Sequence, residues 1–158
     1  MATIQLRDGG DLTLIVGEQK QRYVVCRRTI SGVCKPWNTM FTKFSEACAA
    51  EVELPDDNPE AILILLRVAH LRFDQLPAGK LSVDEVNNLA TVCDKYDAVG
   101  VIRPFLTTWV TFTNLDICHS CSQQAQFCLI LLPSPCAFTE SILLLAVTIR
   151  YLAVVVVR

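Results

Sequence analysis

Cysteine and histidine gather in one stretch of the chain, where their side chains could bind a metal ion. Cys118 and Cys121 are three residues apart with His119 between them, and Cys128 and Cys136 follow. Thiolates at this spacing can bind one zinc ion, which takes four ligands in structural sites. A specific zinc pattern has a second close pair about ten to twenty residues on. Here the other two cysteines stand singly, which favours buried or unstructured thiols, and we expect no metal and no cofactor.

The other reactive side chains form no catalytic pattern. Asp94 and Asp97 lie one helical turn apart, which is typical of a solvated helix face. His70 follows a strongly apolar run, which predicts a hydrogen-bonded interior residue rather than a base or a ligand. The sequence has no glycine-rich phosphate loop and no nucleophile motif. Four cysteines fall on apolar stripes and are predicted to be core thiols, namely Cys26, Cys34, Cys48 and Cys93. We expect no catalytic residue and no enzymatic activity.

Length and charge narrow the class of protein. The chain has 158 residues, which suits one domain of ordinary size. Its formal net charge of −2 gives no basic excess to neutralise phosphates, so we expect no nucleic-acid partner. Charged residues interrupt the first 14 positions, where a signal peptide would need an apolar core. We therefore expect a cytoplasmic or nuclear protein, in which cysteines stay reduced.

The element expected to organise the fold is a capped helix that follows a short strand. Asn58 is a good N-cap residue, Pro59 suits the first helical position and Glu60 complements the helix dipole. The run from residue 61 to 73 is apolar almost all round, which predicts a helix inside the domain.

The remaining patterns predict a sheet and further helices around this central helix. Strands are expected at residues 11–17, 21–26 and 49–54. Apolar residues spaced three and four apart predict a helix over residues 27–41, bent or divided at Pro36. Ser82 and Glu85 form a capping box for a helix that ends near residue 98, and a last helix is expected over 101–110. The sequence thus predicts an α+β domain with a small three-stranded sheet packed against helices.

The composition changes near residue 111. Residues 111–158 hold only four charged residues, and 142–157 form an apolar run. A membrane-spanning helix needs about 17–25 apolar residues, and Arg150 near the centre of this run argues against one. Residues 113–158 are therefore expected to be a disordered tail, a membrane-associated segment or sequence that is not native-like.

The order of these patterns carries a family resemblance over about residues 10–110. The matching stretches are residues 11–17 (DLTLIVG), 37–41 (WNTMF), 53–57 (ELPDD), 59–61 (PEA) and 89–97 (LATVCDKYD). Together they resemble the BTB/POZ domain, in the form common in filamentous fungi. The resemblance implies an α+β interaction domain over residues 1–112.

What the resemblance implies about function is binding to other proteins. BTB/POZ domains self-associate or act as adaptors for cullin-type ubiquitin ligases. In the adaptors, an aromatic or large apolar residue two positions before a glutamate reaches toward the cullin, and Phe44-Ser45-Glu46 stands at the matching place. The alternative is that Phe44 covers the core edge and Glu46 is solvated. A homodimer through residues 29–41 is a further expectation. The expected partner-binding residues are Trp37, Met40, Phe41, Phe44 and Glu46.

Overall fold

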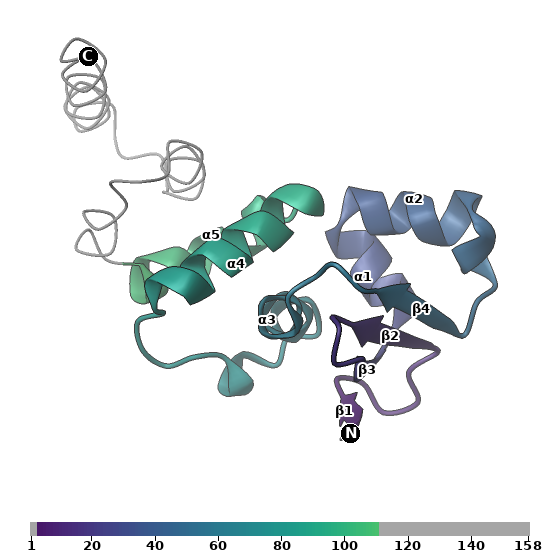
Figure 1. Ribbon diagram of the computed structural model, residues 1–158, viewed down its shortest axis with the longest axis horizontal. Coiled ribbons are helices and arrows are strands. Elements are labelled where there is room, and N and C mark those ends of the chain that lie inside the picture. The colour runs from purple at the N-terminus through teal and green to yellow at the C-terminus, as the bar shows by residue number, and fades with distance from the viewer. Residues whose placement is uncertain (1–2, 111–158) are drawn as a thin grey trace, which may run out of the picture.

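The computed structural model describes residues 3–110, which form one small sheet and a group of helices (Figure 1). The strands are β1 (Thr3–Gln5), β2 (Leu12–Val16), β3 (Gln21–Val25) and β4 (Glu51–Leu54). They lie in the order β1-β3-β2-β4. The β2–β3 hairpin is antiparallel, while β1 pairs with β3 and β4 pairs with β2 in parallel. The mixed α+β class is therefore confirmed.

The sheet has four strands in the described residues instead of the predicted three. The additional strand, β1, has only three residues, with Ile4 between two exposed neighbours. So short a segment carries no readable alternation of apolar and polar residues. Its pairing with β3 of the same chain places it at one edge of the sheet.

Residues 27–43 form two helices, as the proline predicted. Helix α1 (Arg27–Val33) is followed by Cys34, which has an extended backbone. Cys34 is also the N-cap of α2 (Lys35–Lys43), which has Pro36 in its first turn. The start of α1 has no side-chain cap of its own. Its free amides bind distant side chains instead: Asp11 Oδ1 accepts from Arg27 N at 2.8 Å and His70 Nε2 accepts from Cys26 N at 3.1 Å.

Helix α3 (Pro59–Ala69) is the central helix, as predicted. Asn58 Oδ1 accepts from Ala61 N at 3.0 Å, which confirms the N-cap. The helix ends at Ala69 and not at residue 73, so the predicted end was wrong. Leu71 turns into the left-handed region at φ 59° and is exposed, as is Phe73. The apolar residues continue past the end of the helix, which is why the sequence pattern predicted a helix that is too long.

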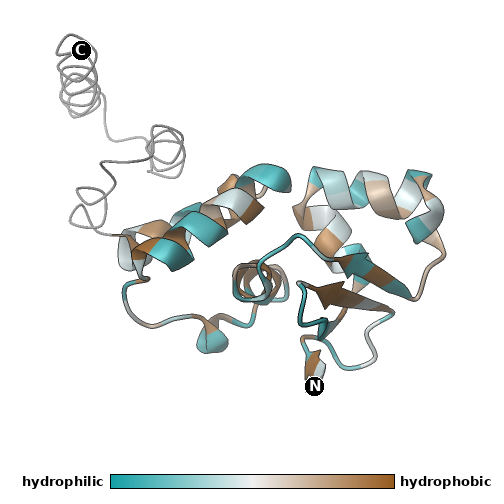
Figure 2. Ribbon diagram, in the orientation of Figure 1, coloured by the Kyte–Doolittle hydropathy of each residue, from teal (hydrophilic) through white to brown (hydrophobic). Residues whose placement is uncertain are grey.

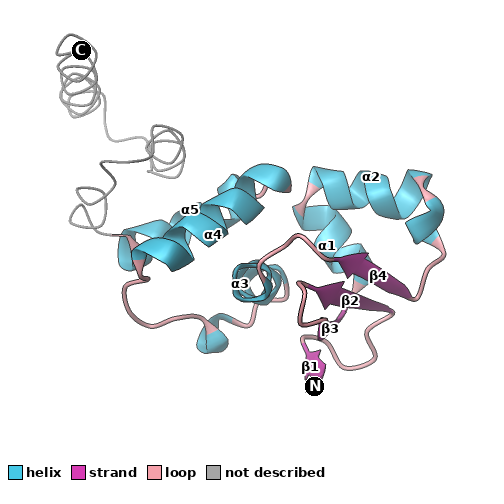
Figure 3. Cartoon of the chain, in the orientation of Figure 1, coloured by secondary structure: helices cyan, strands magenta, loops and turns pink. Residues whose placement is uncertain are grey.

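Two further helices cover the side of α3 that faces away from the sheet (Figures 1 and 3). They are α4 (Val83–Lys95), with the predicted capping box of Ser82 and Glu85, and α5 (Val99–Trp109). Helix α3 contacts β3 and α1 on one side and α4 and α5 on the other. Figure 2 shows hydrophobic residues concentrated on β2 and both kinds of residue on α4, as expected for a half-buried helix. Two short 3-10 helices, η1 (Ser45–Ala47) and η2 (Phe73–Gln75), lie in the loops.

The expectations for the tail lie outside the described residues. These are the zinc candidates Cys118, Cys121, Cys128 and Cys136 and the apolar run 142–157, and they stay predictions. Within residues 3–110, no helix is long and apolar enough to cross a membrane. The same part of the chain contains no group of three or more histidine, cysteine or acidic side chains arranged to hold a metal ion.

Candidate protein-interaction surface

The five expected partner-binding residues fall into two groups in the structure. Trp37 has no exposed surface and Phe41 is also buried, so both rings belong to the core beneath α2. Met40 is half-buried and packs against that core. Phe44 and Glu46 lie outside it. Contact of these residues with a partner stays a prediction. Phe44 is the exposed one among them, and Glu46 is half-buried like Met40.

Phe44 is the most exposed aromatic side chain of this region. It ends α2 with an extended backbone, and 60% of its surface is open to solvent. Ser45 and Glu46 follow in η1, where the Ser45 hydroxyl donates to Glu46 Oε2 at 2.9 Å. An aromatic ring so exposed contributes little to the core. The alternative reading, in which Phe44 covers the core edge, therefore has little support from its exposure.

The loop after Phe44 is held by one arginine. Arg27 Nη1 donates to the carbonyl oxygens of Glu46 at 2.6 Å and Ala47 at 2.7 Å, and Nη2 donates to that of Ala49. The guanidinium also lies 5.3 Å from the centre of the Phe41 ring. We call Arg27 with residues 44–49 the Arg27 loop. No pattern in the sequence pointed to it, because the contacts join residues about twenty positions apart.

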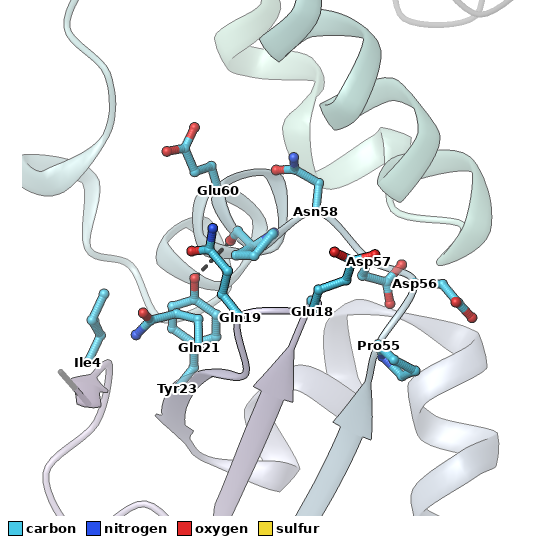
Figure 4. A pocket seen from close by; sticks show the side chains of 12 residues that line it. Ile4, Glu18, Gln19, Gln21, Tyr23, Pro55, Asp56, Asp57, Asn58 and Glu60 are labelled. Carbon is cyan, nitrogen blue, oxygen red and sulfur yellow. Dashed lines mark hydrogen bonds between the residues drawn. The ribbon is translucent and has the colours of Figure 1, made fainter. Parts of the chain in front are cut away.

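A groove runs between the β2–β3 hairpin and the loop before α3 (Figure 4). Its volume is about 950 Å³, and its lining carries the carboxylates of Glu18, Asp56, Asp57 and Glu60 but no lysine or arginine. Tyr23 closes its inner end by donating to the Pro59 carbonyl at 2.9 Å. Burial raises the pKa of Tyr23 to about 12, so the phenol stays a donor. Because the Asp57 carboxylate is paired with Lys95, the negative charge of the groove comes from Glu18, Asp56 and Glu60, and it favours cations over anions.

Gly17 brings the hairpin close to the start of α3. It has φ 70°, and a Cβ at this position would lie 2.8 Å from the Pro59 ring. A side chain here would therefore meet both backbone strain and a steric clash. Gly17 thus sets the spacing of the two elements that line the groove.

Behind the groove, Asp57 joins two of the sequence stretches that carry the family resemblance. It is 6% exposed, and its two oxygens accept from Lys95 Nζ at 2.8 Å and from the Tyr96 hydroxyl at 2.5 Å. Burial, and then the neighbouring Asp57, raise the pKa of Tyr96, which keeps the hydroxyl protonated as a donor. The network ties the loop before α3 to the end of α4. We read it as structural, because all three groups are occupied with one another.

His70 lies at the end of α3, where it is hydrogen-bonded as predicted but half-buried and not fully interior. Because Nε2 accepts from Cys26 N, the proton is on Nδ1, which donates to the Leu66 carbonyl at 2.9 Å. Burial lowers the pKa of His70 below its ordinary 6.5, and the contact with Leu66 offsets only part of that. The neutral imidazole is therefore the folded form, in which it joins α3 to α1.

This arrangement predicts a loss of stability in mild acid. The unfolded chain takes up a proton on His70 at higher pH than the folded chain, so the free energy of unfolding falls as the pH drops through 6.5 towards the folded pKa. Thermal unfolding between about pH 7.5 and pH 5.5 should show this decline. In His70→Gln the decline should be shallower, and equal pH slopes in the two proteins would contradict the assignment. His119 is present in both proteins, so any contribution it makes to the pH slope is the same in both.

The four cysteines predicted to be core thiols do not share one environment. Cys34 and Cys93 are fully buried, and burial raises the pKa of each thiol to about 12, which makes both inert. Cys26 is half-buried, and hydrogen bonds with Thr29 lower its pKa. Cys48 is exposed, so its prediction was wrong. Cys48 lies in the loop that follows η1, where its side chain does not face the core.

Comparison with known proteins finds similarity among solved structures. No protein-family model matches the chain, and no curated protein matches it. Among solved structures, the chain is similar to the BTB domain of zebrafish PATZ1, with a TM-score of 0.45 and 17% sequence identity. The alignment covers 61% of this chain and 71% of that chain. Function is therefore argued below from the chain's own residues.

Proposed function

We propose that residues 1–112 form a BTB/POZ-type protein-interaction domain, in the form common in filamentous fungi. In this proposal the domain is not an enzyme and works in the cytoplasm or nucleus by binding protein partners. The adaptor role for a cullin-type ubiquitin ligase is the specific form that we favour, with Phe44 reaching toward the cullin.

The arrangement of the described elements supports the family proposal. A β-hairpin, a helix pair, a third strand, a buried central helix and a covering helix follow one another in the order that the matching stretches predicted. Two of these stretches, residues 53–57 and 89–97, meet in the buried network of Asp57, Lys95 and Tyr96. The two stretches therefore contact each other in the fold, which explains why both are present in the sequence.

The single observation that carries the interaction role is the contrast along α2. Trp37 and Phe41 are buried, whereas Phe44 is 60% exposed at the end of the same helix. Aromatic side chains, phenylalanine among them, are enriched in protein interfaces relative to the rest of the surface. The surface we assign to partner binding therefore consists of the exposed Phe44 and the half-buried Glu46 and Met40.

Binding to the purified N-terminal domain of a cullin tests this role. We expect Phe44→Ala combined with Glu46→Ala to weaken binding by at least about 30-fold, the factor that a hot-spot side chain contributes. Isothermal titration calorimetry with the full chain gives the dissociation constants.

Phe73→Ala is the matched control, because Phe73 is also an exposed phenylalanine, at 50%, but lies in η2. It should leave cullin binding unchanged. Equal binding by the double variant and the unaltered chain would remove Phe44 and Glu46 from the interface. Failure of the unaltered chain to bind would reject the cullin role. Sedimentation of the free chain then reports the alternative, self-association, which should fall with Phe44→Ala if the same surface is used.

A further inference from the structure

Several carbonyl groups of the Arg27 loop share one side-chain donor. Residues 44–49 leave α2 and form one short 3-10 turn. The carbonyl oxygens of Glu46, Ala47 and Ala49 converge on the guanidinium of Arg27, and that of Glu46 also accepts from Ala49 N at 3.2 Å. Within the turn itself, Ala47 N donates to the Phe44 carbonyl at 3.0 Å.

The shape of the guanidinium matters as much as its charge. It is planar and presents donors in a fixed fork, which can meet carbonyls that lie in different directions at once. A lysine ammonium is a compact point charge on a flexible stem and does not provide that fork. The guanidinium carbon of Arg27 also lies 5.3 Å from the centre of the Phe41 ring, a cation–π contact that favours this position. Asp11 fixes the backbone of the same residue through its amide.

We propose that Arg27 is a positioning residue for partner binding: its fork fixes the turn that orients Phe44 and Glu46. This inference rests on the proposed function, because it assigns how the same surface is presented. Arg27 itself is half-buried beneath the loop and acts through the residues that the loop exposes.

Hydrogen exchange measures the positioning effect without any partner. In Arg27→Lys, amides of residues 44–50 should exchange about tenfold faster, the factor expected when one hydrogen bond to a charged group is lost. Amides of α3 should keep their rates, since the lysine retains the charge and α3 is not part of the loop. Arg28→Lys is the matched control, an exposed neighbouring arginine, and should exchange like the unaltered chain.

Binding to the cullin N-terminal domain then tests whether the turn matters for recognition. Arg27→Lys should weaken binding about tenfold in the unaltered background. It should have no further effect once Phe44→Ala is combined with Glu46→Ala, because residues that act through one another are not additive. Arg27→Ala serves as a second variant if it folds.

The outcomes separate this inference from the proposed function. Unchanged exchange at residues 44–50 in Arg27→Lys overturns the positioning role, and so does an equal rise in α3. Additive losses for Arg27→Lys and the combined Phe44→Ala and Glu46→Ala variant overturn it as well. Faster exchange at residues 44–50 in a chain that binds no cullin would support the turn's dependence on Arg27 while rejecting the cullin role.

Discussion

Asp57→Ala is expected to lower the free energy of unfolding by about 3 kcal/mol. Breaking a buried ion pair by removing one partner usually costs about 3–5 kcal/mol, and the half-exposed Lys95 places this pair at the lower end. The larger part of the loss comes from Tyr96, whose hydroxyl is left buried without its acceptor. Urea unfolding followed by circular dichroism gives the difference.

Two further substitutions separate the charge from the hydrogen bond. Asp57→Asn keeps an acceptor for the Tyr96 hydroxyl but loses the charge that pairs with Lys95, so its loss should be intermediate. Asp56→Ala, next in the chain and exposed, should change stability by no more than about 0.5 kcal/mol. The buried network would lose its assigned role if Asp57→Ala behaved like Asp56→Ala.

Trp37→Ala should be at least as damaging, with a loss of about 3–5 kcal/mol. The indole is fully buried and its ring centre lies 4.7 Å from that of Tyr96. Its removal leaves a cavity where α2 meets the end of α4. Because typical domains are stable by about 5–15 kcal/mol, this change should leave a visibly smaller folded fraction at body temperature.

Phe44→Ala is the surface control for Trp37→Ala. It should change the free energy of unfolding by about 0.5 kcal/mol or less, because the ring is mostly in solvent. Thermal melts of the two variants, measured side by side, separate a core aromatic residue from a surface one. A Trp37→Ala protein as stable as Phe44→Ala would mean that Trp37 is not part of the core.

The parts of the fold that could be predicted from the sequence depend on neighbours a few residues apart. The caps at Asn58 and Ser82 and the division at Pro36 are of this kind, since each involves one helical turn. The sequence also showed which helix is central, because its apolar surface is continuous. It did not show where that helix ends, since Leu71 and Phe73 stay apolar beyond it.

The site was harder to predict because it depends on distant residues. Asp57 and Tyr96 are 39 positions apart, and Arg27 reaches the loop 19 to 22 positions further on. Helical spacing marked Trp37, Met40 and Phe41 as one stripe, but spacing alone cannot distinguish a ring that faces the core from one that faces a partner. The burial of Trp37 and the exposure of Phe44 required the packed structure.

The distant caps of α1 have a consequence for how the chain acquires its structure. Helix α1 has seven residues, and isolated helices shorter than about 12–15 residues are marginal in water. The groups that satisfy its first amides come from positions 16 and 44 residues away. Residues 27–33 therefore have little helical preference of their own, and their conformation is specified by long-range contacts. The helix that begins with Arg27 is capped only where the sheet and α3 are packed beside it, so the presentation of Phe44 depends on the assembled domain as well as on its local sequence.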